Sequence, residues 1–257
     1  MNCKSDYIAV FDSGVGGLSV LRQLRKALPN ERFLYFGDSA NAPYGTRPTE
    51  QIRQLSIAAA EKLMARGAKA LVVACNTATA AAINELRGRW PDRIIIGIEP
   101  ALKPAADRFP GGTIGVMATP ATLREKKFAS LLSRHCGQCQ VVKLPAPGLV
   151  ELIEAGKGDS PEADALLHTL LDPYAGQLDA IVLGCTHYPF AAQAISRIAG
   201  SCTVLFDGGA GTARETRRRL EKAGLLYDGP GELLIENSLN SPAIAALSQQ
   251  LLEEQTV

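Results

Sequence analysis

Short runs of apolar residues alternate along this chain with longer stretches in which apolar residues recur every three or four positions. The short runs predict buried β-strands at Ile8–Phe11, Phe33–Phe36, Leu71–Val73, Ile94–Ile98, Thr113–Met117, Val141–Leu144, Ile181–Leu183 and Val204–Phe206. The longer stretches predict amphipathic helices at Leu18–Leu28, Glu50–Arg66, Ala78–Arg89, Leu123–Leu132, Ala163–Leu171 and Phe190–Ile198. Strands that alternate with helices form parallel sheets covered by helices, so the sequence predicts an α/β fold.

One strand pattern occurs twice in the chain. Residues 70–75 and 180–185 both read as alanine, three branched apolar residues, a small residue and a cysteine. Residues 8–14 and 114–120 share a weaker pattern, an apolar strand followed by a small polar turn. These repeats indicate two similar α/β halves. Because ligands of open parallel sheets bind beyond the carboxyl ends of the strands, halves that face each other would bring Cys75 and Cys185 into a shared central cleft.

Cys75 and Cys185 are the candidate catalytic residues. Each follows a predicted strand and precedes a helix start, where the helix dipole favours a thiolate. Cysteine is also among the most buried residue types, so either one alone is equally well explained by packing, whereas a matched pair favours function. Two opposed thiols suit proton exchange at a carbon atom, in which one thiol removes a proton from one face and the other returns a proton to the opposite face. The configuration of the carbon then inverts.

Each thiol needs a neighbour that accepts or holds its proton, since a free thiol titrates near pH 8.5. Asp12, at the end of the first predicted strand, and His187, two residues after Cys185, are the candidates. The turn Asp12–Gly17 precedes a helix and offers backbone N–H groups to an anionic group of a substrate. It does not match a dinucleotide motif, because Ser19 occupies the position of the third glycine, and no P-loop lysine follows.

The bulk composition favours a small-molecule ligand. The 27 Lys and Arg residues against 26 Asp and Glu residues give a formal charge of +1, which provides no field for nucleic acid or an anionic membrane. No apolar stretch approaches the roughly 18 residues that a membrane-spanning helix requires. The polar N-terminus does not resemble a signal peptide, so we expect a cytoplasmic protein with reduced cysteines. Cys136 and Cys139 form a lone C-x-x-C, for which no metal site is expected and whose role stays open.

Several motifs together resemble the glutamate racemases of the aspartate/glutamate racemase superfamily, which supply D-glutamate for peptidoglycan and thus for the cell wall and cell shape. In chain order the motifs are Asp12-Ser13-Gly14-Val15-Gly16-Gly17, Tyr35-Phe36-Gly37-Asp38 with Pro43-Tyr44-Gly45, Ala74-Cys75-Asn76-Thr77-Ala78, Gly97-Ile98-Glu99-Pro100-Ala101, Ala118-Thr119 with Thr122, and Gly184-Cys185-Thr186-His187-Tyr188-Pro189. They span nearly the whole chain in the order typical of the family.

The resemblance implies a role for each matching residue. Cys75 and Cys185 correspond to the two catalytic thiols, with Asp12 assisting the first and with His187 and Glu151 assisting the second. The implied substrate contacts are Asp12, Ser13, Tyr44, Gly45, Asn76, Thr77, Thr119, Thr122, Thr186 and His187. The family uses no pyridoxal phosphate, metal or other cofactor and commonly forms homodimers. It has two α/β domains, which places one domain here at residues 1–97 plus 207–257 and the other at 98–206.

Three alternatives stay open at this point. An aspartate or hydantoin racemase of the same superfamily would share these motifs, because preference for side-chain length depends on cleft geometry. A non-catalytic amino-acid binder would use the same cleft, although both cysteines argue against it. A two-thiol redox protein would form a disulfide between Cys75 and Cys185, whereas a racemase keeps them apart with substrate between them.

Overall fold

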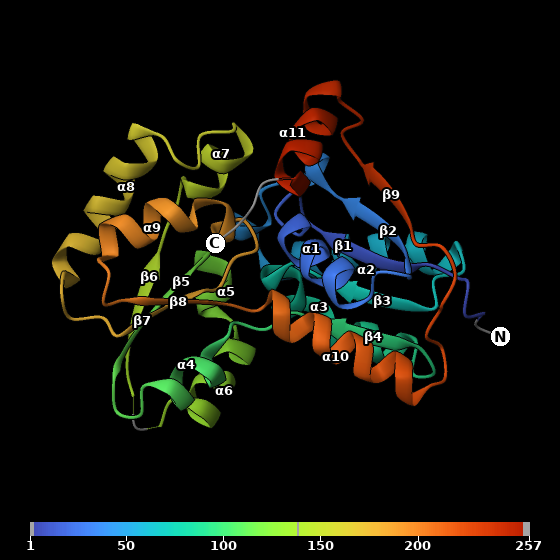
Figure 1. Cartoon of the computed structure of the whole chain (residues 1–257), viewed down its shortest axis with the longest axis horizontal. Helices are drawn as coiled ribbons and strands as arrows, with labels where there is room; N and C mark the ends of the chain where they lie inside the picture. The colour runs from blue at the N-terminus through green and yellow to red at the C-terminus, as the bar shows by residue number, and fades with distance from the viewer. Residues whose placement is uncertain (1–2, 138, 254–257) are drawn as a thin grey trace.

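The computed structural model describes residues 3–137 and 139–253, which form two parallel sheets with helices on both faces of each (Figure 1). The five-stranded first sheet has the order β4-β3-β1-β2-β9, with strands Ile94–Gly97, Ala70–Val73, Ile8–Asp12, Arg32–Gly37 and Glu232–Asn237. The four-stranded second sheet has the order β6-β5-β7-β8, with strands Gln140–Pro145, Thr113–Ala118, Ala180–Leu183 and Val204–Asp207. The α/β class predicted from the sequence is confirmed.

The first sheet separates two apolar cores because successive residues of a strand point to opposite faces. Ile8 and Val10 of β1 pack with α1 (Leu18–Ala27), α10 (Gly209–Lys222) and α11 (Pro242–Glu253). Ala9 and Phe11 of the same strand pack on the other face with α2 (Thr49–Ala65) and α3 (Asn76–Arg89). Both faces are covered, which explains why these strands are continuous apolar runs.

The second sheet is built in the same way. Met117 of β5 packs against α7 (Leu149–Glu154), α8 (Pro161–Leu171) and α9 (Ala192–Ala199). Its neighbour Val116 points to the opposite face, which α4 (Leu102–Arg108) and α6 (Lys126–His135) cover. The short α5 (Pro120–Arg124) lies between β5 and α6.

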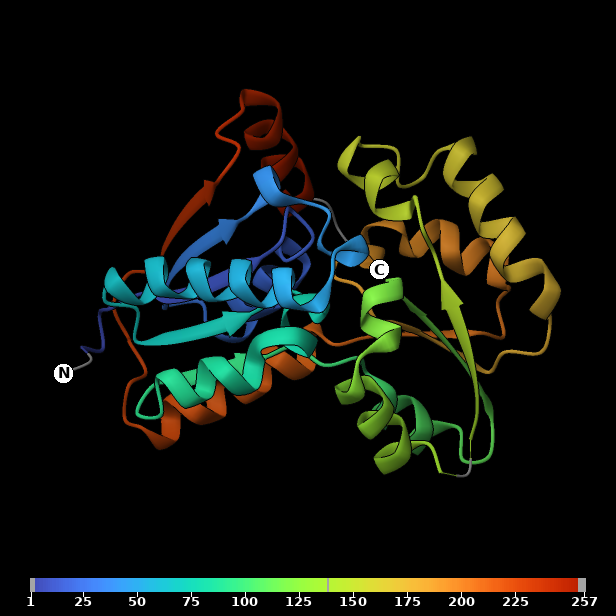
Figure 2. The ribbon, with the colours of Figure 1, turned by 180° about the vertical axis from the view of Figure 1, so that it is seen from behind.

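The chain crosses between the two units twice, as Figure 2 shows. It enters the second unit between β4 and α4 and returns between β8 and α10. Strand β9 then adds to the edge of the first sheet beside β2 in parallel register, with Phe33 opposite Leu233. The first unit therefore contains both ends of the described chain, and the second unit is formed by the segment of sequence between β4 and α10.

The structure corrects the sequence prediction in several places. All eight predicted strands are present, whereas β9, α4, α7, α10 and α11 lie outside the ranges predicted above. The segment predicted as one helix at Leu123–Leu132 is helical on both sides of Glu125, whose extended backbone (φ −70°, ψ 140°) separates α5 from α6. Three further connections are 3-10 helices, at Ser39–Asn41, Tyr44–Thr46 and Asp172–Tyr174, and another at Tyr188–Ala191 precedes α9. Within residues 3–137 and 139–253, none of the helices is long and apolar enough to cross a membrane.

Candidate active site

A cavity of about 70 Å³ lies between the two units, where loops that follow strands of both sheets meet. Among the residues predicted from the sequence, its lining contains Ser13, Tyr44, Gly45, Cys75, Asn76, Thr77, Thr119, Glu151, Cys185, Thr186 and His187. Asp12 and Thr122 are not in the lining but hydrogen-bond to residues that are. The structure therefore brings the predicted set together around one pocket.

Cys75 is held at the junction of β3 and α3. Its Sγ accepts a hydrogen bond from the Ala78 N–H at 3.4 Å, which makes the thiol the N-cap of α3 and starts this helix at Asn76 instead of the predicted Ala78. Ser13 Oγ lies 3.4 Å from the same sulfur. Burial raises the pKa of Cys75 to about 12, and the nearby Asp12 charge adds to this, while the Ser13 and Ala78 hydrogen bonds oppose it. At neutral pH Cys75 is therefore a thiol.

Asp12 is fully buried at the end of β1, yet both of its carboxyl oxygens have partners. Oδ1 accepts the Gly14 N–H at 2.8 Å, and Oδ2 accepts the Thr186 hydroxyl from the second unit at 3.0 Å. Burial raises the pKa of Asp12, although the charge of His187 and these hydrogen bonds lower it. A carboxyl group with a raised pKa is suited to exchanging a proton near neutral pH.

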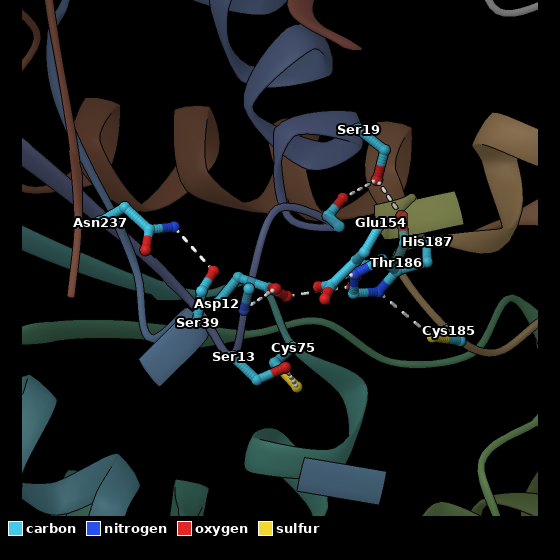
Figure 3. Close-up of polar contacts among 12 residues, drawn as sticks. Asp12, Ser13, Ser19, Ser39, Cys75, Glu154, Cys185, Thr186, His187 and Asn237 are labelled. Atoms are coloured by element: carbon cyan, nitrogen blue, oxygen red, sulfur yellow. Dashed lines mark hydrogen bonds and ion pairs between the residues drawn. The ribbon is translucent and has the colours of Figure 1, made fainter. Parts of the chain in front are cut away.

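Cys185 stands beside a histidine–carboxylate pair (Figure 3). His187 Nδ1 lies 3.8 Å from Cys185 Sγ, and His187 Nε2 lies 2.9 Å from Glu154 Oε1. Burial opposes a charged imidazole, but the contacts with Cys185 and Glu154 outweigh it and hold the pKa of His187 well above its usual range. Burial also opposes charge on Glu154, but the His187 hydrogen bond outweighs it and lowers the pKa of Glu154. His187 is therefore an imidazolium that lies beside the Cys185 sulfur.

The carboxylate that hydrogen-bonds to His187 was not predicted from the sequence. The resemblance assigns Glu151, with His187, to the Cys185 half of the site, and the hydrogen bond to His187 comes from Glu154, three residues later in α7. Residues three apart share one face of a helix, so both glutamates line the pocket. α7 packs against the 3-10 helix Tyr188–Ala191 that follows His187, and this packing within the second unit brings Glu154 to the imidazole. The spacing of the two glutamates alone could have raised Glu154 as a second candidate.

The glycines of the turn after β1 allow the two units to approach closely. A Cβ atom on Gly14 would lie 2.4 Å from Glu154 Oε1, and one on Gly16 would lie 2.3 Å from His187 Nδ1. Both distances are too short for any side chain, so the turn has room for the His187–Glu154 pair only because these positions are glycine.

Hydroxyl groups and one amide complete the pocket on the Cys75 side. The hydroxyl of Thr77, from the first unit, and those of Thr119 and Thr122, from the second, hydrogen-bond to one another at 3.0 to 3.1 Å. Tyr44 donates its hydroxyl to Asp38 at 2.7 Å and so braces the wall instead of offering the hydroxyl to a ligand. The buried Oδ1 of Asn76 has no hydrogen-bond partner within the described part of the chain. An unpaired acceptor in a pocket wall is suited to a donor group of a ligand.

Comparison with known proteins identifies the family. A family model described as Asp/Glu/Hydantoin racemase matches residues 10–216. The chain belongs to this family. As a racemase it is an isomerase, and its two thiols and their partners all lie in or beside the matched region.

Relatives of this racemase include proteins named for glutamate. The chain is 47% identical over 253 residues to the glutamate racemase of Clostridium perfringens (strain SM101 / Type A), which covers 97% of each chain. A glutamate racemase from Francisella tularensis in complex with D-glutamate has a TM-score of 0.85 and 27% identity, covering 98% of this chain and 95% of that one. The Escherichia coli glutamate racemase in complex with L-glutamate and the activator UDP-MurNAc-ala has a TM-score of 0.84 and 30% identity, covering 95% of each.

Proposed function

We propose that this racemase interconverts L-glutamate and D-glutamate by proton transfer at Cα between Cys75 and Cys185, without a cofactor. The observation that carries the proposal is the pairing of two buried free thiols, one from each unit, in one pocket. Each thiol has its own ionisable neighbour, Asp12 near Cys75 and His187 beside Cys185. The redox alternative requires a disulfide between two thiols that are free in this structure.

The proton balance of the reaction follows from this arrangement. Starting from L-glutamate, the Cys185 thiolate beside the His187 imidazolium takes the Cα proton, and the electron pair of the C–H bond stays on Cα. The Cys75 thiol then gives its proton to the opposite face of Cα, which yields D-glutamate. Cys185 is left as a thiol and Cys75 as a thiolate, so one proton must pass from Cys185 to Cys75 through Asp12, His187 or solvent before the next L-glutamate reacts. D-glutamate runs through the same steps in reverse.

The polar lining of the pocket suits an amino acid with two carboxylates. The unpaired Oδ1 of Asn76, a residue of the lining, can accept a hydrogen bond from an ammonium group. The hydroxyls of Ser13 and Thr77 and nearby backbone N–H groups line the pocket and can donate to carboxylates, while the Thr186 hydroxyl donates to Asp12. The solved relatives that hold D-glutamate and L-glutamate support glutamate over aspartate as the substrate.

Incubation of the protein with L-glutamate in deuterated water, after dialysis against a chelator and without added cofactor, tests the reaction. We expect deuterium to enter Cα together with inversion to D-glutamate. Activity that returns only with a metal or pyridoxal phosphate would refute cofactor independence. Aspartate with a specificity constant equal to that of glutamate would move the assignment to the aspartate racemases, and we expect glutamine to be a very poor substrate because it leaves buried donors unpaired.

Serine variants of the two thiols test the mechanism. A serine alkoxide is scarcely populated at neutral pH, so Cys75→Ser and Cys185→Ser should each abolish racemisation. The double variant should lose little more than either single variant, because the two thiols work as a unit. Near-normal racemisation by either folded single variant would overturn the two-thiol mechanism.

The cellular role rests on the family resemblance. We propose that the product supplies peptidoglycan synthesis in the cytoplasm, that the protein is a homodimer, and that its domains are residues 1–97 plus 207–257 and residues 98–206. Growth of a D-glutamate auxotroph that expresses the chain, and sedimentation of the purified protein, are the tests. Failure of the active enzyme to support growth, or a monomer in sedimentation, would contradict the respective proposal.

A further inference from the structure

Ser19, in the first turn of α1, forms a hydrogen bond between the two units. Its Oγ lies 2.8 Å from the carbonyl oxygen of Thr186 in the second unit and 2.8 Å from that of Gly16 in its own turn (Figure 3). The Gly16 carbonyl already accepts the Ser19 backbone N–H at 3.1 Å. The hydroxyl has a single proton, which the two carbonyl oxygens share, and the contact with Thr186 is the one that reaches the second unit.

The bond from Ser19 reaches Thr186, a residue next to the second thiol and its histidine. Thr186 lies between Cys185 and His187 in sequence, and its own hydroxyl donates to Asp12 at 3.0 Å. Gly16, the other acceptor of Ser19, lies directly against His187. The Ser19 hydroxyl therefore joins the segment that carries the second thiol and its histidine to the turn that follows β1.

Ser19 does not reach the catalytic pocket. It lines a separate cavity of about 710 Å³ between α1 and α9, together with Gln23 and Ser196. A substrate in the pocket between the thiols is therefore not in contact with Ser19, and any effect of this residue on catalysis has to act through Thr186 and its neighbours.

We propose that Ser19 is a positioning residue for the Cys185 half of the site, a role that rests on the proposed two-thiol reaction. Its hydroxyl holds Cys185 and His187 at the distance from the β1 turn at which Cys185 faces the substrate. The Cys75 half has its own supports, the Ser13 hydroxyl and the Ala78 N–H. Loss of the Ser19 hydroxyl therefore loosens one half of the site and leaves the other half in place.

Loosening only the Cys185 half affects the reaction of D-glutamate and that of L-glutamate differently, which a general loss of structure would not do. From D-glutamate, Cys75 still removes the Cα proton, but the delivery of a proton by Cys185 becomes slow. The carbanion then waits, Cys75 exchanges its proton with solvent, and deuterium returns to the original face without inversion. From L-glutamate the slow step comes first, and the intact Cys75 completes the inversion.

The experiment compares deuterium exchange with inversion for both enantiomers in Ser19→Ala. We expect kcat to fall about tenfold, because Cys185 and His187 are held less closely in the geometry that the reaction needs. The ratio of exchange to inversion should rise severalfold from D-glutamate and stay unchanged from L-glutamate. Ser19→Thr keeps the hydroxyl, and the adjoining cavity has room for its methyl group, so this variant should stay within about threefold of the wild type.

Ser56→Ala is the matched control. Ser56 donates to the Ile52 carbonyl within its own helix at 2.7 Å, so this variant removes a serine hydroxyl that does not join the units. Both of its readouts should equal those of the wild type. An unchanged ratio from D-glutamate in Ser19→Ala would refute the proposal even if kcat falls, and so would equal losses in Ser19→Ala and Ser19→Thr. Ser19→Cys, which has a similar shape and a weak donor, gives the same comparison where Ser19→Ala does not fold. Wild-type protein that neither exchanges nor inverts glutamate would instead refute the proposed function.

Discussion

Gly16→Ala tests whether the close approach of the two units sets the catalytic geometry. The added Cβ would lie 2.3 Å from His187 Nδ1, 2.6 Å from its Cε1 and 2.7 Å from Thr186 Oγ1. An ordinary contact begins at 3.4 Å, so the imidazole has to retreat by about 1 Å. A misplacement of this size at a catalytic group costs on the order of 100-fold in rate, and we expect kcat/KM to fall by about that factor.

The fold should tolerate this substitution. Gly16 does not have a positive φ, so alanine fits its backbone, and the clash is relieved by a shift between the units. We expect the free energy of unfolding to change by less than about 1 kcal/mol. Racemisation followed by the circular dichroism of the amino acid, alongside urea unfolding, measures both effects.

Gly88→Ala is the control for Gly16→Ala. A Cβ on Gly88, within α3, would meet no atom within 4 Å. Alanine should therefore keep full activity and stabilise the helix by up to about 1 kcal/mol. Activity of Gly16→Ala within threefold of the wild type, or a loss that follows unfolding alone, would refute the link between this glycine and the position of the histidine.

Three further predictions concern charge. Glu154→Gln removes the carboxylate that helps to raise the pKa of His187, so the imidazolium loses its proton at lower pH. We expect kcat/KM to fall about tenfold and its decline at alkaline pH to shift to lower pH. An unchanged pH profile would contradict this. Because burial raises the pKa of Cys75 from 9.0 to about 12, the thiolate fraction at pH 8 is about a thousandfold lower than in an ordinary thiol. Its alkylation by iodoacetamide, followed by peptide mapping, should keep rising about tenfold per pH unit beyond pH 9, where a plateau would disprove the raised pKa. Lys69→Met leaves the buried carboxylate of Glu31 without its 2.6 Å partner, which should lower the free energy of unfolding by about 3 to 5 kcal/mol. Adding Glu31→Leu to the same chain should restore much of the lost stability. A loss below about 1 kcal/mol in urea unfolding would show that the pair is dispensable.

The sequence by itself determined the fold class and pointed to the two thiols as candidate catalytic residues. Strands that are buried on both faces must be apolar throughout, so their runs are visible in any window of the chain. The cysteines were identified because each ends a strand of the same repeated pattern, at 70–75 and 180–185. Strand β9 was not predicted because its apolar core is three residues long and half-exposed at the sheet edge, between Glu232 and Glu236.

The tertiary structure decided which side chains serve those thiols. Glu151 and Glu154 share one face of α7, and the packing of that helix against the 3-10 helix after His187 brings Glu154 to the imidazole, beside the Gly14–Gly16 turn. The contact between Ser19 and Thr186 joins residues 167 positions apart, which no local pattern encodes. A local sequence pattern determines which face of a strand or helix is buried, because that depends on periodicity alone. The atoms that meet across the cleft depend on the relative position of the two units, which the packing of the whole chain fixes.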